Sequence, residues 1–190
     1  MEEKTINLRL ILNGCEQGNR YSQERLYQYY YPYAMSIALR YAKDRLEARE
    51  ILNEAFLKVF TKLHQYDKDY PFQIWLRRIV INTAIDYYRK KQRRPFFLPL
   101  ENAFSAVDEG ADDFNLDPTI NTLPIIQELP PSYRMVFNLY VMEGYKHHEI
   151  AEKLGISVST SKTNLSRAKQ KLKKLIKSRS HYKLKMQGNG

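Results

Sequence analysis

The chain of 190 residues is 43% hydrophobic and 27% charged, which is typical of a soluble globular protein with one or two domains. Its formal net charge of +10 favours a polyanionic partner, either nucleic acid or an anionic membrane surface. No apolar run approaches membrane-spanning length, and the acidic, polar N-terminus lacks the pattern of a signal peptide. The single cysteine, Cys15, excludes an intramolecular disulfide, so we expect a cytoplasmic protein with this residue in its core.

The fold class follows from the hydrophobic periodicity. The chain has only seven glycines and no alternating hydrophobic runs, so we expect an all-α protein with two small helical domains. Apolar spacing predicts helices over about 6–14 and 23–43, the second kinked rather than ended by Pro32. The tyrosines between Tyr27 and Tyr33 are interpreted as packing residues rather than as a stacking platform.

Residues 46–64 form a predicted amphipathic helix with an acidic side. Its inward side is expected to carry Ile51, Leu52, Ala55, Phe56, Val59 and Leu63. Glu47, Glu50 and Glu54 recur at steps of three and four, which predicts a shared outer stripe. Such a stripe is usually only a solvated face, but in so basic a chain it also fits a protein-binding surface.

A polar connector, 65–71, precedes a helix predicted over 72–94, with Pro71 suited to its first turn. This helix combines aromatic and apolar side chains with exposed or flanking polar groups. They are Arg77, Arg78, Asn82, Arg89, Lys90, Lys91, Arg93 and Arg94. Cations that follow phosphates, beside aromatic rings that stack on bases, suit binding to single-stranded nucleic acid. Spacing alone also allows the alternative of core aromatics beside a solvated basic face.

The composition changes abruptly after residue 94. Residues 95–122 contain no Lys or Arg and are rich in proline and acidic side chains. The acidic residues are Glu101, Asp108, Glu109, Asp112, Asp113 and Asp117. We interpret this segment as a flexible acidic linker, and a plain spacer is the simplest role for it.

The most specific motif lies within residues 144–174. A short helix is predicted over 147–154, Gly155 suits its left-handed end, and Ser157 is placed to cap the next helix. The apolar side of that next helix is expected to carry Val158, Ser161, Leu165, Ala168, Leu172 and Ile176. Its outer side carries Ser159, Thr160, Thr163, Arg167, Gln170 and Lys174, with Asn164 on one flank.

Hydroxyls at the front of a basic helix, with an arginine farther along, suit a helix end that enters a major groove. The pattern therefore predicts a helix-turn-helix, supported by a further helix over 131–140. A solvated basic helix in an ordinary bundle is the alternative. The basic tail, 178–190, is expected to be frayed.

Two blocks of sequence resemble one family. FQIWLRRIVINTAIDYYRK, preceded by EAREILNEAFLKVF, is similar to region two of the extracytoplasmic-function (ECF) sigma factors of the sigma-70 family. LPPSYRMVFNLYVMEGYKHHEIAEKLGISVSTSKTNLSRAK is similar to their region four. Two positions depart from the family pattern: Ile81 stands where a basic residue is common, and Ser161 where valine is usual. These departures predict a lost promoter contact and a less tightly anchored recognition helix.

The resemblance implies a subunit that brings core RNA polymerase to promoters, with region two at 6–94 and region four at 123–177. The implied contacts with the minus-35 element are Ser159, Thr160, Lys162, Thr163, Asn164 and Arg167. Those implied for the unpaired minus-10 strand are Lys68, Tyr70, Arg78, Asn82 and Arg89. Those implied for core polymerase are Glu50, Leu52, Asn53, Glu54 and Lys58.

The resemblance further implies the β′ clamp and β flap of polymerase as partners, an anti-sigma protein that can be membrane-bound, and a linker that threads the polymerase channel. A stand-alone helix-turn-helix regulator is the alternative, but it leaves the basic aromatic helix without a purpose. An enzyme is not expected. The four histidines lack metal-ligand spacing, and no phosphate-binding glycine loop occurs, so we expect neither a metal nor a cofactor.

Overall fold

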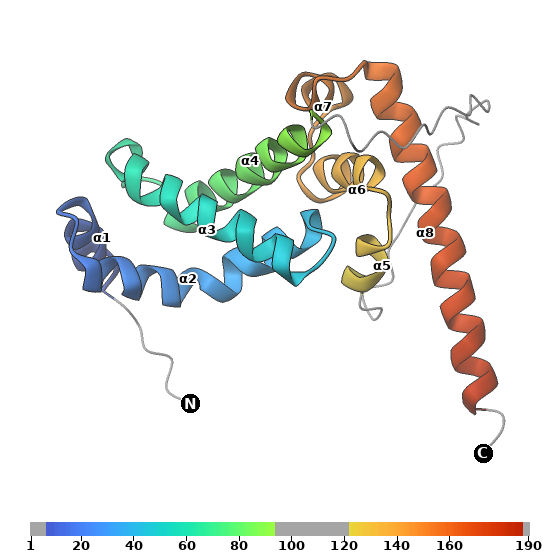
Figure 1. Cartoon of the computed structure of the whole chain (residues 1–190), viewed down its shortest axis with the longest axis horizontal. Coiled ribbons are helices and arrows are strands. Elements are labelled where there is room, and N and C mark those ends of the chain that lie inside the picture. Colours follow the sequence, from blue (N-terminus) through green and yellow to red (C-terminus); the bar gives the residue numbers. More distant parts are fainter. Residues whose placement is uncertain (1–6, 94–121, 188–190) are drawn as a thin grey trace. The chain divides into compact units, whose positions relative to one another are not determined.

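The computed structural model describes residues 7–93 and 122–187, and this part of the chain contains helices and no strand. The helices are α1 (Leu8–Glu16), α2 (Arg20–Tyr41), α3 (Arg45–Lys62), α4 (Phe72–Gln92), α5 (Leu123–Gln127), α6 (Pro131–Phe137), α7 (His147–Leu154) and α8 (Val158–Gln187) (Figure 1). A 3-10 turn, Leu63–Gln65, follows α3, and a π-helical turn, Asn138–Met142, follows α6. The all-α prediction is confirmed. The chain divides into two compact units between Tyr87 and Tyr88, near the end of α4.

In the first unit, α1 packs against α2, and α2 packs against α3. The core consists of side chains that recur every three or four residues along α2, α3 and α4. Leu26, Ile37, Leu52 and Leu76 have no exposed surface, because they fill the space between these helices. Burial of this stripe stabilises helices that would be marginal alone in water.

Helix α2 begins after Asn19, whose side chain accepts a hydrogen bond from the Ser22 amide at 3.0 Å. The helix continues through Pro32, as predicted. Tyr27 and Tyr30 hold α2 to its neighbours: the Tyr27 ring lies 4.7 Å from Phe56 of α3, and the Tyr30 ring 5.0 Å from Phe72 of α4. The interpretation as packing residues is confirmed for Tyr27 and Tyr30, whereas Tyr29 of the same cluster is 47% exposed.

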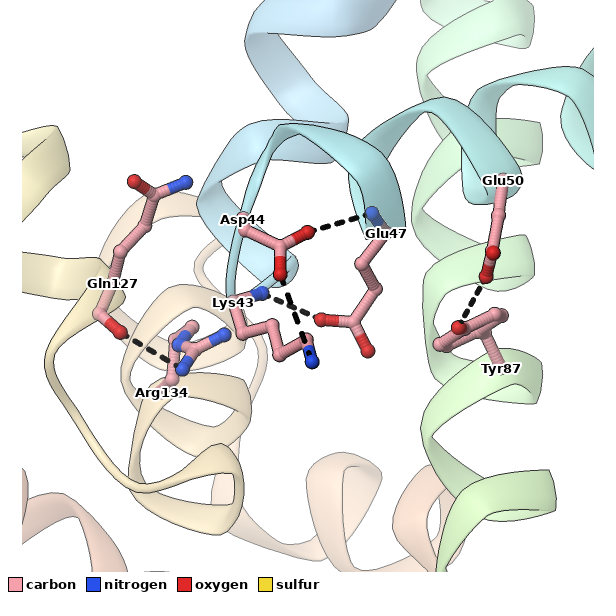
Figure 2. A network of polar contacts seen from close by, with 7 residues as sticks. All are labelled: Lys43, Asp44, Glu47, Glu50, Tyr87, Gln127 and Arg134. Atoms are coloured by element: carbon pink, nitrogen blue, oxygen red, sulfur yellow. Dashed lines mark hydrogen bonds and ion pairs between the residues drawn. The ribbon is translucent and has the colours of Figure 1, made fainter.

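Two carboxylates order the start of α3, as Figure 2 shows. Asp44 accepts a hydrogen bond from the Glu47 amide at 2.9 Å, and Glu47 accepts one from the Lys43 amide at 2.6 Å. The bond from the Glu47 amide lowers the pKa of Asp44, because it stabilises the ionised carboxylate. Glu47 is only 8% exposed. The prediction that Glu47 lies on the outer acidic stripe was therefore wrong. Its carboxylate turns inward because it accepts a hydrogen bond from the free Lys43 amide before the first turn of α3.

In the second unit, α6 and α7 pack against α8, and α5 contacts α8 as well. The buried Arg134 of α6 joins the short α5 to this group. Its Nη2 atom donates to the carbonyl oxygens of Gln127 at 3.0 Å (Figure 2) and Leu129 at 2.8 Å. The buried Asn138 side chain donates to the Arg134 carbonyl at 3.0 Å. Five residues are too few for a stable isolated helix, so these bonds and the contact with α8 keep α5 in place.

Several expected boundaries differ from the structure. Helix α8 continues to Gln187, so the tail expected to be frayed from residue 178 is helical over most of its length. The sequence did not predict α5, whose two isoleucines, Ile125 and Ile126, are buried. The acidic residues of the predicted linker lie outside the described residues. Within the described ranges, no helix has both the length and the apolarity that a bilayer span requires.

Candidate nucleic-acid interface

The second unit contains the predicted helix-turn-helix. Helix α7 ends as expected at Gly155, whose φ of +68° is the left-handed conformation that glycine adopts without strain. The amides of Gly155 and Ile156 both donate to the Ala151 carbonyl, at 2.9 and 3.1 Å. Ser157 then caps α8, because its Oγ atom accepts from the Thr160 amide at 2.9 Å. These local bonds fix the turn from which α8 starts.

A side-chain contact also joins the two helices of the motif. Ser161 of α8 is fully buried, and its Oγ atom lies 2.9 Å from Nδ1 of His147, the first residue of α7. The His147 ring in turn stacks on the Tyr140 ring at 4.6 Å. The Ser161 hydroxyl thus forms a hydrogen bond across the motif, and the expected looser anchoring of the recognition helix stays a prediction. Sequence spacing gave no signal for this contact.

The front of α8 presents polar groups to the surrounding solvent. Ser159, Thr160 and Lys162 are exposed, and the Thr160 hydroxyl lies 2.8 Å from the capping Ser157 hydroxyl. Val158, expected on the apolar side, is 42% exposed. An exposed, capped helix start with hydroxyl and ammonium groups at its surface is suited to contacts with bases and phosphates.

The remaining expected contacts on α8 are more enclosed. Thr163 and Arg167 are half-buried, and Asn164 is only 9% exposed. Nη1 of Arg167 lies 3.4 Å from the Tyr133 hydroxyl of α6, near the upper limit for a hydrogen bond. Tyr133 therefore engages the guanidinium group only weakly, whereas Asn164 presents little surface to any partner.

In the first unit, the connector before α4 forms an ordered loop. The Asp69 amide donates to the Asp67 side chain at 3.0 Å, and the Tyr66 hydroxyl donates to the Tyr70 carbonyl at 2.5 Å. The Tyr66 ring packs 5.3 Å from both Phe72 and Trp75. This anchoring leaves the Tyr70 side chain 64% exposed, so the loop offers one aromatic ring for stacking.

Two residues before Tyr70 in the chain, Lys68 is also exposed. Its ammonium group lies 3.4 Å from the Glu16 carboxylate of α1. An ion pair between exposed side chains contributes little to stability, so a phosphate can replace the carboxylate at small cost. Both loop residues expected at the minus-10 strand are therefore accessible to a ligand.

Helix α4 places amide and basic groups along one side. Arg78 and Asn82 are exposed one turn apart, and Arg89 is half-buried farther along the same side. Ile81 is 3% exposed. The side chain of Ile81 thus lies in the core, and the loss of a promoter contact at this position stays a prediction.

Helix α3 carries most of the residues expected at core polymerase on one exposed side. We define the α3 outer face as Leu46, Glu50, Asn53, Glu54 and Leu57, which recur at helical spacing and are all exposed. The two leucines are 66% and 65% exposed, and the sequence reading overlooked them. Leu46 lies four residues before Glu50, and Leu57 four residues after Asn53. This helical spacing already indicated that both leucines share the side of the two polar residues. An acidic face with two exposed leucines is typical of a protein-binding surface.

Two other residues expected at this surface are less accessible. Leu52 has no exposed surface and belongs to the core, so it packs beneath the α3 outer face and is not part of it. The Lys58 ammonium group lies 2.9 Å from Asp86 of α4 and 3.4 Å from Glu54. Lys58 therefore neutralises Asp86, which lies between Asn82 and Arg89 along α4. The helical position of Lys58 was clear from the sequence, but its partner on α4 was not.

Cys15 is 3% exposed, and burial followed by the charge of Glu16 raises the pKa of its thiol to about 11. Its interpretation as a core residue rather than a nucleophile is confirmed, because the thiolate is scarce near neutral pH. Across the part of the chain that the structure describes, histidine, cysteine and carboxylate side chains form no group of three suited to a metal ion.

These two units define a two-part nucleic-acid-binding protein, and comparison with known proteins gives its family. The family model "Sigma-70 region 2" matches residues 26–94, and "Sigma-70, region 4" matches residues 123–172. The chain is 28% identical over 162 residues to the RNA polymerase sigma factor SigZ of Bacillus subtilis, which covers 85% of this chain and 90% of SigZ. It is 30% identical over 145 residues to the ECF sigma factor SigW of the same species, covering 69% of this chain and 76% of SigW.

Among solved structures, the complex of the sigma factor RpoE with the anti-sigma factor NepR from Bartonella quintana aligns with 81% of this chain and 96% of the matched chain. The sequence identity is 17% and the TM-score 0.46. The matches to the two family models and to SigW show that the chain belongs to the ECF subfamily of the sigma-70 RNA polymerase sigma factors.

We predict that the Ser161 hydroxyl stabilises the second unit. Ser161→Ala should lower the free energy of unfolding by about 0.5–1.5 kcal/mol, because a hydrogen bond in a buried position is lost. Urea unfolding followed by circular dichroism measures this change. Ser159→Ala, two residues earlier but exposed, is the control and should have almost no effect. Equal effects of the two substitutions would contradict the assigned role of Ser161.

We also predict a pH dependence centred on His147. Desolvation by burial, followed by the charges of Lys162 and Lys169, lowers its pKa below the ordinary 6.5. The unfolded chain therefore binds a proton more readily than the folded one, so stability is complete above about pH 6.5 and declines as the pH falls through and below that value. Thermal melting between pH 7.5 and 5.5 should show this decline. His147→Ala should reduce it, whereas removal of the exposed His148 should leave it in place.

Proposed function

We propose that this sigma factor recognises promoters through two surfaces with different tasks. The second unit reads the paired minus-35 element, and the first unit binds core polymerase and captures the unpaired minus-10 strand. One observation carries the proposal: a capped helix-turn-helix occurs in the same chain as an exposed amide and basic side of α4 beside an exposed aromatic ring. The first arrangement suits duplex DNA, and the second suits unpaired bases.

Reading of the minus-35 element is assigned to the start of α8. Ser159, Thr160 and Lys162 are exposed for contacts with phosphates and base edges, and Thr163 lies beside them. Arg167 is the residue suited to a bidentate contact with guanine, because its planar guanidinium group matches two acceptors. The nearby Tyr133 hydroxyl supports the guanidinium in the free protein. Asn164 is only 9% exposed, so we assign it a minor contact beside that of Arg167.

Capture of the minus-10 strand is assigned to the loop around Tyr70 and to α4. Tyr70 supplies a stacking surface, Asn82 donors and acceptors for a base, and Lys68, Arg78 and Arg89 charges for phosphates. An unstacked base costs a few kcal/mol, which these contacts must offset. The ordered backbone of the loop helps, because little conformational entropy remains to be lost on binding.

Binding to the β′ clamp of core polymerase is assigned to the α3 outer face. Glu50 and Glu54 supply negative charge in a chain of net charge +10, and Leu46 and Leu57 supply apolar area. Charge complementarity favours a basic partner surface and speeds association. We further assign the β flap to the second unit, and an anti-sigma protein as a partner that competes with polymerase.

The same proposal makes the chain a non-enzymatic, cytoplasmic subunit, in which region two ends near residue 94 and region four spans 123–177. The decisive experiment is transcription in vitro with purified core polymerase and a library of genomic promoter fragments. Defined start sites that appear only when this protein is added support the proposal. DNA binding without any new start site would instead identify a regulator that acts without joining polymerase.

We predict separable defects in the two DNA-binding surfaces. Arg167→Ala should reduce discrimination on a duplex that carries only the minus-35 element by roughly 1–3 kcal/mol, if the contact with guanine is bidentate. Asn82→Ala should leave that binding unchanged but slow strand opening, measured as permanganate reactivity of the minus-10 element. A pre-melted promoter should rescue little of this defect, because the lost contact is with the single strand.

Gln170→Ala is the matched control for Arg167, since this exposed residue lies about one turn farther along α8. It should retain sequence discrimination. The division of tasks would be refuted if Asn82→Ala weakened duplex binding as much as Arg167→Ala does.

We predict that reversing the charge of the α3 outer face weakens binding to core polymerase. The double substitution Glu50→Lys and Glu54→Lys should lower the affinity while the helical circular dichroism is retained, because both side chains are exposed. The double reversal of Glu16 and Glu24 to lysine is the control, since it changes the net charge equally at exposed positions of the same unit outside the α3 outer face. Similar affinity losses for both variants would indicate a general charge effect and not a docking face.

A further inference from the structure

Two polar side chains of the α3 outer face are held by tyrosine hydroxyls from other helices. The Tyr87 hydroxyl of α4 donates to Oε2 of Glu50 at 2.6 Å, as Figure 2 shows. The Tyr27 hydroxyl of α2 donates to Oδ1 of Asn53 at 3.1 Å. Glu50 and Asn53 are neighbours on the face, three residues apart. Helices α2 and α4 thus each hold one of two neighbouring side chains on α3.

Both tyrosines are half-buried, which restricts where each hydroxyl can lie. The Tyr27 ring packs at 4.7 Å on Phe56 of α3 and at 5.6 Å on Tyr31 of its own helix. Tyr87 is half-buried near the end of α4. A glutamate side chain on a helix surface has several rotamers, and a partner protein must select one of them when it binds. A hydrogen bond from a fixed hydroxyl selects the rotamer in advance.

These bonds leave the face able to bind a partner. A carboxylate has about four acceptor positions, and the Tyr87 hydroxyl occupies one of them. Glu50 can thus accept further bonds from a basic side chain while it is held. In Asn53 the bond engages the oxygen and leaves the Nδ2 donors for a partner. The tyrosines therefore orient the face without occupying it.

We propose that Tyr87 and Tyr27 are positioning residues that pre-organise Glu50 and Asn53 for docking to core polymerase. This inference rests on the proposed role of the α3 outer face. The tyrosines act through the side chains that they hold, so the loss of either hydroxyl weakens docking by leaving a docking side chain free to rotate. An exposed hydrogen bond contributes little to folding, so the main consequence is for binding and not for stability.

The test is a double-mutant cycle on the affinity of the full-length protein for purified core polymerase. Tyr87→Phe removes one hydroxyl and keeps the ring, and it should weaken binding roughly three- to tenfold. In a Glu50→Ala background the same substitution should have no further effect, because the side chain that Tyr87 positions is absent. Tyr27→Phe is tested in the same way against Asn53→Ala.

Tyr33→Phe is the matched control. It removes a hydroxyl that donates to the Gln73 carbonyl at 3.4 Å, in the same unit but away from the α3 outer face. It should leave the affinity for polymerase unchanged. Melting temperatures of all the variants separate effects on docking from effects on folding.

The possible outcomes are distinct. Loss of affinity for Tyr87→Phe that disappears in the Glu50→Ala background supports the inference. An equal loss in both backgrounds, or a loss that follows the melting temperature, overturns it by showing a purely structural role. If Glu50→Ala weakens binding and Tyr87→Phe does not, the inference fails and the docking role of the face stands. If neither Glu50→Ala nor Tyr87→Phe changes the affinity for polymerase while the protein still initiates transcription, the assignment of the α3 outer face fails together with the inference.

Discussion

The close approach of α2 and α3 is the constraint on which the first unit depends. The alanines of these two helices, Ala34, Ala38, Ala48 and Ala55, have no exposed surface. With only a methyl group at each contact, the helix backbones come near enough for larger neighbouring side chains to interlock. Long and charged side chains are then left on the outer sides of the helices. The exposed faces of α3 and α4 are therefore a consequence of how the inner faces pack.

The second unit uses buried polar groups where the first uses small apolar ones. Arg134 holds the end of α5, Asn138 bonds back to Arg134, and Ser161 contacts His147 across the helix-turn-helix. Hydrogen bonds have directional requirements that apolar contacts lack, so they restrict how the short helices can be oriented. That restriction matters most for α8, because reading a groove requires a defined helix orientation at the DNA.

The sequence predicted the features that arise from local physics. The bounds of α7, the left-handed Gly155 and the Ser157 cap were all correct, because each depends on residues a few positions apart. The errors occurred where a distant or competing partner decides. Glu47 turned inward to cap a helix, and the partners of Lys58 on α4 and of Ser161 on α7 were not foreseen. Helical spacing indicates the side of a helix on which a residue lies, but it does not identify the residue that it meets there. Candidate contacts on exposed sides were therefore easier to choose than their supporting residues.

The aromatic anchor of the loop before α4 has a spectroscopic consequence. Trp75 is the only tryptophan in the chain, and its ring lies 5.3 Å from Tyr66 and 5.6 Å from Phe72. Tyr66 also bonds to the Tyr70 carbonyl, so a rearrangement of the loop on binding a strand changes the surroundings of the indole directly. The intrinsic fluorescence of the unmodified protein thus reports from one known place, beside the loop, without an attached dye and without a second tryptophan to separate.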